Sequence, residues 1–407
     1  MNTKTLKNYA KLVVKVGANV QKGQDVRILV SPQNVEFAHY LAEEAYKAKA
    51  RKVIVDFSDE TLIKLNYKYR SLKTLSTVEK YEEAIEQYDV DNKPCCIYVE
   101  DKDPDYLNGV DTAKMSKARQ ARYPILKPYR EANENRYQWV IVALPSVKWA
   151  KKVFPGVDEE EAFEMLDEAI YQCTRLDGDP IANWEKHVKT LATKARKMNR
   201  YHFDRLTYTS SNGTNLTVGL HPKHVWLSAE ETQMNGTQFV ANMPTEEVFT
   251  MPDKYRVDGK VVSTKSLSYQ GNLIEDFTVQ FKKGKAVKVK AKVGQKYLEE
   301  MISMDASAPY LGEVALVPYD SPINRTGIMF YNTLFDENAC CHLAFGMAFR
   351  NNLKNYEKMS NEDFEKENYN DSMIHVDFMI GSEDLKIVGT TKEDKEVVVF
   401  ENGVWAI

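Results

Sequence analysis

The chain has 407 residues and a formal net charge of -4, with 43% hydrophobic and 28% charged residues. These values are ordinary for a globular protein of about two domains, and they exclude the strongly basic surface of a nucleic-acid-binding protein. No apolar run approaches the roughly 18 residues of a transmembrane helix, and the N-terminus lacks the apolar block of a secretory signal. The five cysteines show no disulfide or metal-knuckle spacing. We therefore expect a cytoplasmic protein with reduced thiols and with neither a nucleic-acid nor a membrane partner.

The first half of the chain alternates between short apolar segments and helical ones. Runs rich in β-branched residues occupy residues 26–31, 52–57, 95–99 and 138–145. Helical spacing is found over 34–49 and 111–133, and again over 158–200. This alternation predicts βαβ units and a mostly parallel sheet. No glycine-rich phosphate-binding motif follows any of the predicted strands, which disfavours a nucleotide-binding protein.

The composition changes near residue 200, where turn pairs and alternating runs become frequent. The turn pairs are Asn212-Gly213, Asn235-Gly236 and Lys283-Gly284. The runs at 277–281 and 286–291 predict antiparallel strands, and the lysines around the last turn are expected on the solvated face of a hairpin. The charge-rich segment 357–369 is expected to be a surface loop or short exposed helix. The fold class is therefore α/β: an alternating N-terminal domain over 1–200, then a mixed α+β domain rich in antiparallel strands over 201–407.

Two of the seven histidines lie where they could bind a metal ion. His375 and Asp377 are two residues apart on a predicted strand, so both side chains project from one face, as a divalent ion would need. A hydrogen-bonded surface pair has the same pattern. His342 lies in a run expected to form a helix that Asp336 or Asn338 could cap. It would be the only polar residue on the buried face of that helix, and it needs a partner, either a metal or a hydrogen bond. The other histidines are expected to be structural or exposed: His39, His187, His202, His221 and His224.

Acidic residues interrupt two apolar strand-like segments. One is Glu313, and the other is the pair Glu246-Glu247, of which only one can point inward if both lie on a strand. Burying a carboxylate without a cation or hydrogen-bond donors costs several kcal/mol. Three acids and two histidines in such settings predict a cation site, and two divalent ions could share it through a bridging carboxylate.

The same residues lie in blocks that resemble the aminopeptidase T and aminopeptidase S family of bacterial two-metal aminopeptidases. The blocks are NYAKLVVKVGANVQKGQDVRILV, NMPTEEVFTMPD, YLGEVALVP, SPINRTGIMFYNTLFDENACCHLAFG and NDSMIHVDFMIGSE. The resemblance spans the whole chain and implies hydrolysis of N-terminal residues from small peptides. It implies a homodimer and two divalent ions, with Zn, Co and Mn all compatible with the donors. The implied metal ligands are Glu247, Glu313, His342, His375 and Asp377, with Glu313 as the expected bridge.

One position departs from the family pattern. The family has a tyrosine seven residues after the histidine that matches His342, and this chain has Phe349 there. If the segment is helical, Phe349 shares a face with His342 and looks toward the ions. Losing an oxyanion donor typically costs on the order of a hundred- to a thousandfold in rate, unless the ions suffice or Tyr331 or Tyr356 substitutes. The alternative function is therefore a catalytically weakened metal-binding protein that binds peptides. The general base is left unassigned, because Glu246 is expected to point outward.

Overall fold

The computed structural model describes residues 1–407, which form two compact units. The first unit contains residues 1–188 and 230–244, and the second contains 189–229 and 245–407. Helix α9 (Pro180–Tyr201) carries the chain from the first unit into the second. The division into domains 1–200 and 201–407 stays a prediction.

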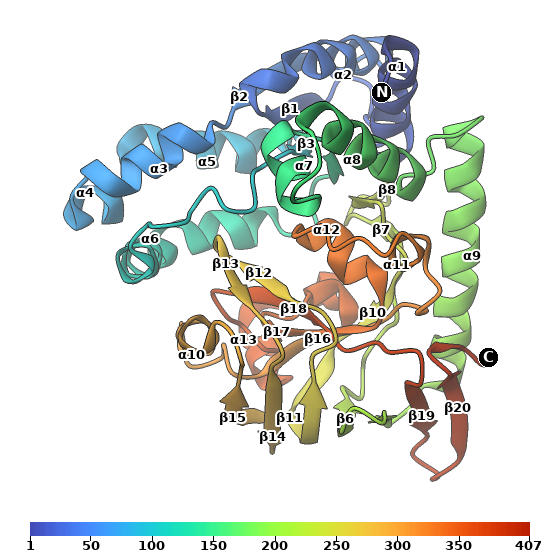
Figure 1. Ribbon diagram of the computed structural model, residues 1–407. Coiled ribbons are helices and arrows are strands. Elements are labelled where there is room, and N and C mark those ends of the chain that lie inside the picture. The colour runs from blue at the N-terminus through green and yellow to red at the C-terminus, as the bar shows by residue number, and fades with distance from the viewer. The chain divides into compact units, whose positions relative to one another are not determined.

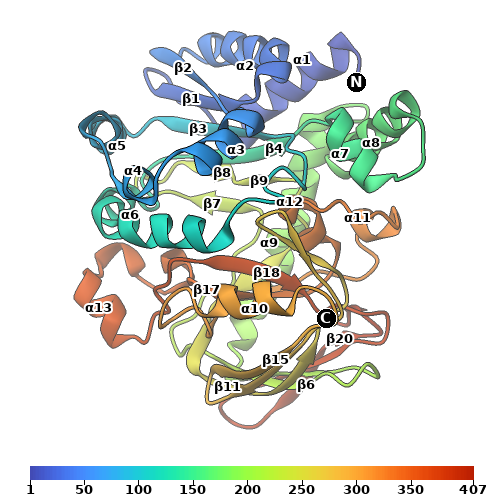
Figure 2. The same cartoon turned by 60° about the vertical axis from the view of Figure 1, so that its left-hand side comes forward.

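The first unit is built on a parallel sheet of five strands in the order β2-β1-β3-β4-β9. The strands are β1 (Asp25–Val30), β2 (Lys52–Phe57), β3 (Cys95–Glu100), β4 (Trp139–Ala143) and β9 (Asn242–Met243). Every neighbouring pair is parallel, so the expected parallel sheet is confirmed. Figure 2 shows the order from β2 through β1 and β3 to β4. The four apolar runs predicted as strands all form this sheet, because continuous β-branched segments suit strands that are covered on both faces.

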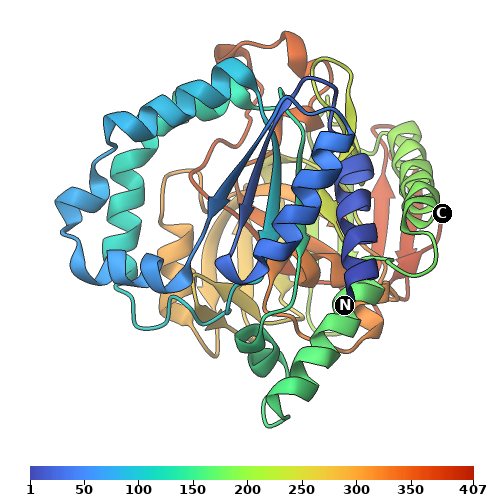
Figure 3. The ribbon, with the colours of Figure 1, turned by 90° about the horizontal axis from the view of Figure 1, so that it is seen from above.

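Helices surround this sheet and also extend beside it. They are α1 (Thr3–Leu12), η1 (Val13–Gly17), η2 (Pro32–Asn34), α2 (Val35–Lys47), α3 (Glu60–Tyr69), α4 (Leu72–Ser76), α5 (Lys80–Asn92), α6 (Thr112–Asn133), α7 (Val147–Val153) and α8 (Glu159–Cys173). Tyr9 of α1 and Phe37 of α2 pack with their ring centroids 5.3 Å apart. Figure 3 shows α3 to α6 extending from the sheet as an arm, on the side away from α1 and α2. The short strands β7 (Glu230–Thr232) and β8 (Gln238–Val240) form a hairpin at the predicted Asn235-Gly236 turn. None of the helices has the length and apolar composition needed to cross a membrane.

The second unit contains a large antiparallel sheet in the order β15-β14-β11-β6-β5-β19-β20-β21. Its strands are β5 (Arg205–Thr209), β6 (Asn215–Leu220), β11 (Pro252–Val262), β14 (Thr278–Lys282), β15 (Lys285–Lys290), β19 (Lys386–Thr390), β20 (Glu396–Glu401) and β21 (Val404–Trp405). The predicted turns at Gly213 and Gly284 connect β5 to β6 and β14 to β15, with φ angles of +98° and +82° that glycine adopts readily. The antiparallel character expected of the second half is confirmed.

A second, four-stranded sheet in the order β10-β16-β17-β18 lies within the same unit (Figure 1). Its antiparallel strands are β10 (Val248–Thr250), β16 (Leu311–Leu316), β17 (His342–Gly346) and β18 (His375–Met379). Smaller elements complete the unit: β12 (Leu267–Tyr269), β13 (Asn272–Ile274), α10 (Gln295–Ile302), α11 (Pro322–Arg325), α12 (Thr333–Asp336), η3 (Glu337–Ala339), η4 (Arg350–Asn352), η5 (Tyr356–Lys358) and α13 (Asn361–Lys366). The last two confirm short exposed helices over the charge-rich segment.

One face of the four-stranded sheet packs on aromatic residues of the larger sheet. Phe345 of β17 and Phe378 of β18 stack with centroids 4.9 Å apart. Phe345 also contacts Phe281 of β14 at 5.9 Å, and Phe378 contacts Phe277 at 5.7 Å. Because strand residues alternate between faces, the neighbours of these phenylalanines project from the opposite face. That opposite face carries the polar residues singled out from the sequence.

Candidate metal centre

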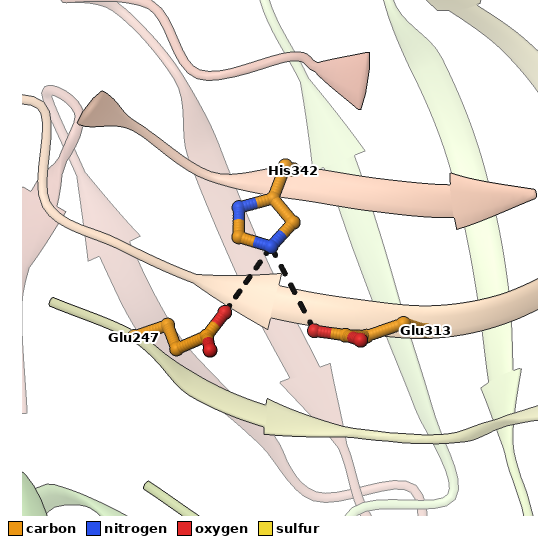
Figure 4. Close-up of side chains that lie close together, drawn as sticks. All are labelled: Glu247, Glu313 and His342. Atoms are coloured by element: carbon orange, nitrogen blue, oxygen red, sulfur yellow. Dashed lines mark ion pairs between the residues drawn. The ribbon is translucent and has the colours of Figure 1, made fainter. Parts of the chain in front are cut away.

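The five residues proposed as metal ligands all belong to the four-stranded sheet or its immediate edge. Glu247 directly precedes β10, Glu313 lies on β16, His342 on β17, and His375 and Asp377 on β18. All are buried except His375, whose side chain is 18% exposed. Figure 4 shows Glu247 and Glu313 pointing toward the imidazole of His342. Strand pairing thus brings together five side chains from four separate segments of the chain.

The pairing register explains why these side chains share one face. Ala344 of β17 pairs with Glu313 of β16 on one side and with Asp377 of β18 on the other. His342 lies two residues before Ala344 on β17, and His375 lies two residues before Asp377 on β18. Residues two apart on a strand share a face, so both histidines project from the face that carries Glu313 and Asp377. A methyl group is all that Ala344 places between the two carboxylates. The small residue therefore leaves room over the middle strand for a bound group.

A bulge in β16 directs Glu313 toward this face. The register between β16 and β17 shifts between Leu311 and Glu313, at Gly312. A Cβ atom at Gly312 would lie 2.3 Å from the carbonyl oxygen of Met347 and 2.4 Å from that of Gly346. Only glycine fits this approach of the backbones. Bulges of this kind often re-aim a side chain at a functional site.

The five side chains form two groups of three that share Glu313. In the first group, Nε2 of His342 lies 3.2 Å from Oε2 of Glu247 and 3.7 Å from Oε1 of Glu313. In the second, Nε2 of His375 lies 3.2 Å from Oε2 of Glu313 and 3.3 Å from Oδ1 of Asp377. The two oxygens of Glu313 therefore face different histidines. A carboxylate in this position can bridge two cations.

Backbone carbonyls orient both imidazoles. Nδ1 of His375 lies 2.7 Å from the carbonyl oxygen of Met347, and Nδ1 of His342 lies 3.4 Å from that of Cys340. A proton on Nδ1 donated to the carbonyl leaves the lone pair of Nε2 directed at the carboxylates. Metal-binding histidines are commonly held in this way. With this tautomer, every group that meets at the centre is an electron-pair donor, which favours a cation among them.

The charges of the cluster also fit a cation. Burial opposes protonation of His342, but hydrogen bonds to Glu247 and Glu313 hold its pKa well above the ordinary value. Burial likewise opposes protonation of His375, and Asp377 together with Glu313 raises its pKa. Burial, and then Glu313 beside it, raises the pKa of Glu247. The buried carboxylates thus draw protons to the cluster, and divalent ions can replace these protons. The donor set of three carboxylates and two imidazoles fits two such ions.

Glu337 is a further acidic residue at the centre that the sequence did not indicate. It lies on η3, and burial raises its pKa well above the ordinary value, with Asp377 and Glu247 adding to the shift. Its carboxyl group lies close to that of Asp377. Two neighbouring carboxyl groups are a further place where a cation fits. Glu337 was not identified from the sequence, because the segment was expected to be helical. Two residues five positions apart on a helix, such as Glu337 and His342, do not share a face.

The expectation that His342 lies on a helix is wrong. The helical turns end with α12 and η3, and His342 begins β17, which pairs with β16 and β18. A short apolar run suits a buried helix and a buried strand equally, and here pairing on both edges decides for the strand. Asp336 caps no helix at His342 but accepts hydrogen bonds from the backbone N–H groups of Phe330 and Asn332, both at 2.9 Å.

Two related expectations also change. Glu246 is buried rather than directed outward, because it precedes β10 instead of lying on a strand. Phe349 does lie beside the centre, although the helical reasoning that put it there does not apply. Its ring centroid is 4.6 Å from that of His375 and 6.1 Å from that of Phe249.

Three of the remaining histidines form a separate cluster bound to the backbone. Nε2 of His221 lies 2.9 Å from the carbonyl oxygen of Glu367, and Nδ1 of His224 lies 2.7 Å from that of His221. The exposed ring of His202 stacks on the buried ring of His224 at 4.7 Å. These contacts agree with the structural or surface role expected for them.

Comparisons with known proteins agree over the whole chain. The family model described as thermophilic metalloprotease (M29) matches residues 2–405. Aminopeptidase AmpS of Bacillus subtilis (strain 168) is 43% identical over 403 residues, which cover 98% of each chain. Aminopeptidase T of Thermus thermophilus is 37% identical and covers 99% of each chain. The solved structure of wild-type AmpT from Thermus thermophilus matches with a TM-score of 0.90 at 36% identity, covering 99% of each chain. A dihydroxypyridine dioxygenase from Pseudomonas putida KT2440, 12% identical with a TM-score of 0.52, shares the fold alone.

Proposed function

The chain belongs to the thermophilic metalloprotease (M29) family, and from this premise we propose that it is an aminopeptidase that uses two divalent ions. The names of its relatives support removal of N-terminal residues from peptides. The observation that carries the two-ion proposal is the position of Glu313, whose two oxygens face the imidazoles of His342 and His375. Neither a single ion nor a hydrogen-bonded core needs that arrangement.

We assign the ligands by these contacts. Glu247 and His342 would hold one ion, His375 and Asp377 would hold the other, and Glu313 would contribute to both. When bound, the ions supply Lewis acidity toward the scissile carbonyl and a water acidic enough to attack near neutral pH. The protein residues fix the spacing of the two positions and keep the donors buried. Zn, Co and Mn all suit imidazole and carboxylate donors.

Glu337 is proposed as an additional ligand beside Asp377. Its carboxyl group lies close to that of Asp377, so a cation that binds Asp377 would attract both groups. Glu337→Gln is then expected to weaken ion binding itself. Normal ion binding with a lost kcat would instead assign Glu337 as the general base.

A homodimer in the cytoplasm completes the proposal. All five cysteines are free and buried, which supports a reducing compartment. Large apolar side chains are exposed on the arm: Leu62, Leu65, Tyr69, Leu72, Tyr81 and Ile85. A second copy would cover such a surface, since monomers rarely expose large apolar patches. A dimer would also admit only small peptides to the centre. Light scattering of the wild type and of a variant with Leu62 and Tyr81 replaced by serine tests whether the dimer forms.

The experiment that tests the activity uses protein stripped with a chelator and reloaded separately with zinc, cobalt or manganese. Leucine-type chromogenic amides and short peptides serve as substrates, and the same peptides with acetylated N-termini serve as controls. Hydrolysis that vanishes on stripping, returns on reloading and spares the blocked peptides supports the proposal. Tight ion binding without hydrolysis of any peptide would overturn it in favour of a peptide-binding protein with a weakened centre.

A further inference from the structure

We propose that Asn338 is a positioning residue of this centre, because its side-chain amide joins the backbone before Glu247 to the carboxylate of Glu337. The inference rests on the proposed function, since it concerns how two ion-binding segments are held together. The hydrogen bonds of Asn338 go to Glu246, Glu337 and Leu334, so its effect on the centre passes through the two acidic segments.

The geometry uses both ends of the amide. Asn338 is fully buried on η3. Its Oδ1 accepts a hydrogen bond from the backbone N–H of Glu246 at 2.7 Å. Its Nδ2 donates to Oε1 of Glu337 at 3.2 Å and to the carbonyl oxygen of Leu334 at 3.1 Å. One side chain therefore connects two segments that are 92 residues apart in the sequence.

The contact with Glu246 anchors the Glu247 ligand on the side where the sheet does not. Strand β10 starts at Val248, which pairs with Leu316 of β16, so sheet pairing fixes Glu247 only from its C-terminal side. On the N-terminal side, the hydrogen bond to Asn338 holds the backbone. Losing it would therefore loosen the backbone next to Glu247.

The contact with Glu337 sets the direction of that carboxylate. The donor Nδ2 engages Oε1, in a carboxylate that lies close to that of Asp377. Only a side chain with a donor and an acceptor on one planar group can serve both contacts, and asparagine is the shortest. Aspartate would keep the acceptor for the Glu246 N–H but would present an oxygen to the Glu337 carboxylate. Leucine has the same branched shape, although it is bulkier, and would remove both contacts.

The experiment compares the full-length wild type with Asn338→Asp and Asn338→Leu. The matched control is Asn352→Asp, because Asn352 is equally buried and donates to the carbonyl oxygen of Val225 at 3.1 Å. Affinity for Mn²⁺ is measured without substrate, from the electron paramagnetic resonance signal of the free ion. Thermal unfolding of the ion-free proteins reports stability, and kcat is measured as a function of Mn²⁺ concentration.

We expect Asn338→Asp to weaken Mn²⁺ binding on the order of 10- to 100-fold, the usual cost of removing a group that orients a ligand. High Mn²⁺ concentrations should restore most of its kcat. Asn352→Asp should lose stability and keep its Mn²⁺ affinity. If Asn338→Leu fails to fold, Asn338→Asp still carries the test.

Wild-type affinity in Asn338→Asp, or a loss no larger than in Asn352→Asp, would overturn the positioning role while leaving the metal centre intact. A wild type that binds no Mn²⁺, Zn²⁺ or Co²⁺ would overturn the proposed function itself, and the inference on Asn338 with it.

Discussion

Glu313 belongs to both groups of three candidate ligands, which predicts how many ions three substitutions should remove. Glu247→Gln should remove the ion held with His342, and Asp377→Asn should remove the ion held with His375. Glu313→Gln should remove both, because each of its oxygens faces a different histidine. We therefore expect two bound ions in the wild type, one in each of the first two variants and none in the third.

The same series predicts the stability that the ions add. A ligand present at 1,000 times its Kd stabilises the folded state by about 4 kcal/mol, so two independent ions contribute about 8 kcal/mol. The variants with one ion should gain about 4 kcal/mol on reloading, and Glu313→Gln should gain nothing. For a unit of roughly 200 residues, 4 kcal/mol corresponds to about 8–16 °C in Tm.

The assay measures each protein twice, stripped and reloaded, so that any change in the ion-free fold cancels. Elemental analysis after dialysis gives the number of bound ions, and scanning calorimetry gives the shift in Tm. Glu246→Gln is the matched control, because Glu246 is buried next to Glu247 and belongs to neither group of three. It should keep both ions.

Two results would refute this reasoning. If Glu313→Gln keeps one ion at wild-type affinity, then Glu313 does not bridge the two positions. If Glu247→Gln and Asp377→Asn each lose both ions, the two groups do not fill independently. Loss of an ion in Glu246→Gln would show that the whole edge of the sheet, rather than the named carboxylates, governs binding.

Three further predictions concern single residues. Phe349→Tyr should change kcat by less than about tenfold, because we expect the ions to stabilise the transition state without this hydroxyl; a hundredfold rise in kcat would instead indicate a weakened centre. Ala344→Leu should abolish ion binding, measured by elemental analysis, while the circular dichroism spectrum stays unchanged, because the larger side chain enters the space between Glu313 and Asp377; retained ions would contradict this. Burial lowers the pKa of His224 to about 4, so the folded state favours the neutral imidazole. The stability that depends on this neutral form is fully present above the unfolded pKa of about 6.5. That contribution, about 3 kcal/mol, is lost as pH falls through 4. Urea unfolding from pH 7 to 4 should therefore show a weaker pH dependence in His224→Gln than in the wild type, and equal dependence would contradict the assignment.

Much of the fold could be predicted because its signals are local. Continuous β-branched runs such as 52–57 and 95–99 form the parallel sheet, since a strand covered on both faces needs apolar side chains on each. The period of two placed His375 and Asp377 on one face without knowledge of any neighbour. Burying a carboxylate in an apolar strand is costly, so the sequence alone indicated that Glu313 needs a cation or a hydrogen-bond donor beside it.

The rest depended on contacts between segments far apart in the sequence. The run from His342 suits a helix or a strand, and only pairing with β16 and β18 made it a strand. That pairing put Ala344 between Glu313 and Asp377 and so left space over the middle strand. The positions of Glu337 and Asn338 near the candidate ligands could not be predicted, because both depend on contacts with residues far away in the sequence: Asp377 for Glu337, and Glu246, 92 positions away, for Asn338. Residue chemistry and periodicity are properties of the chain, whereas the separation between two ligand atoms is set by strand register and packing, which only the tertiary structure determines.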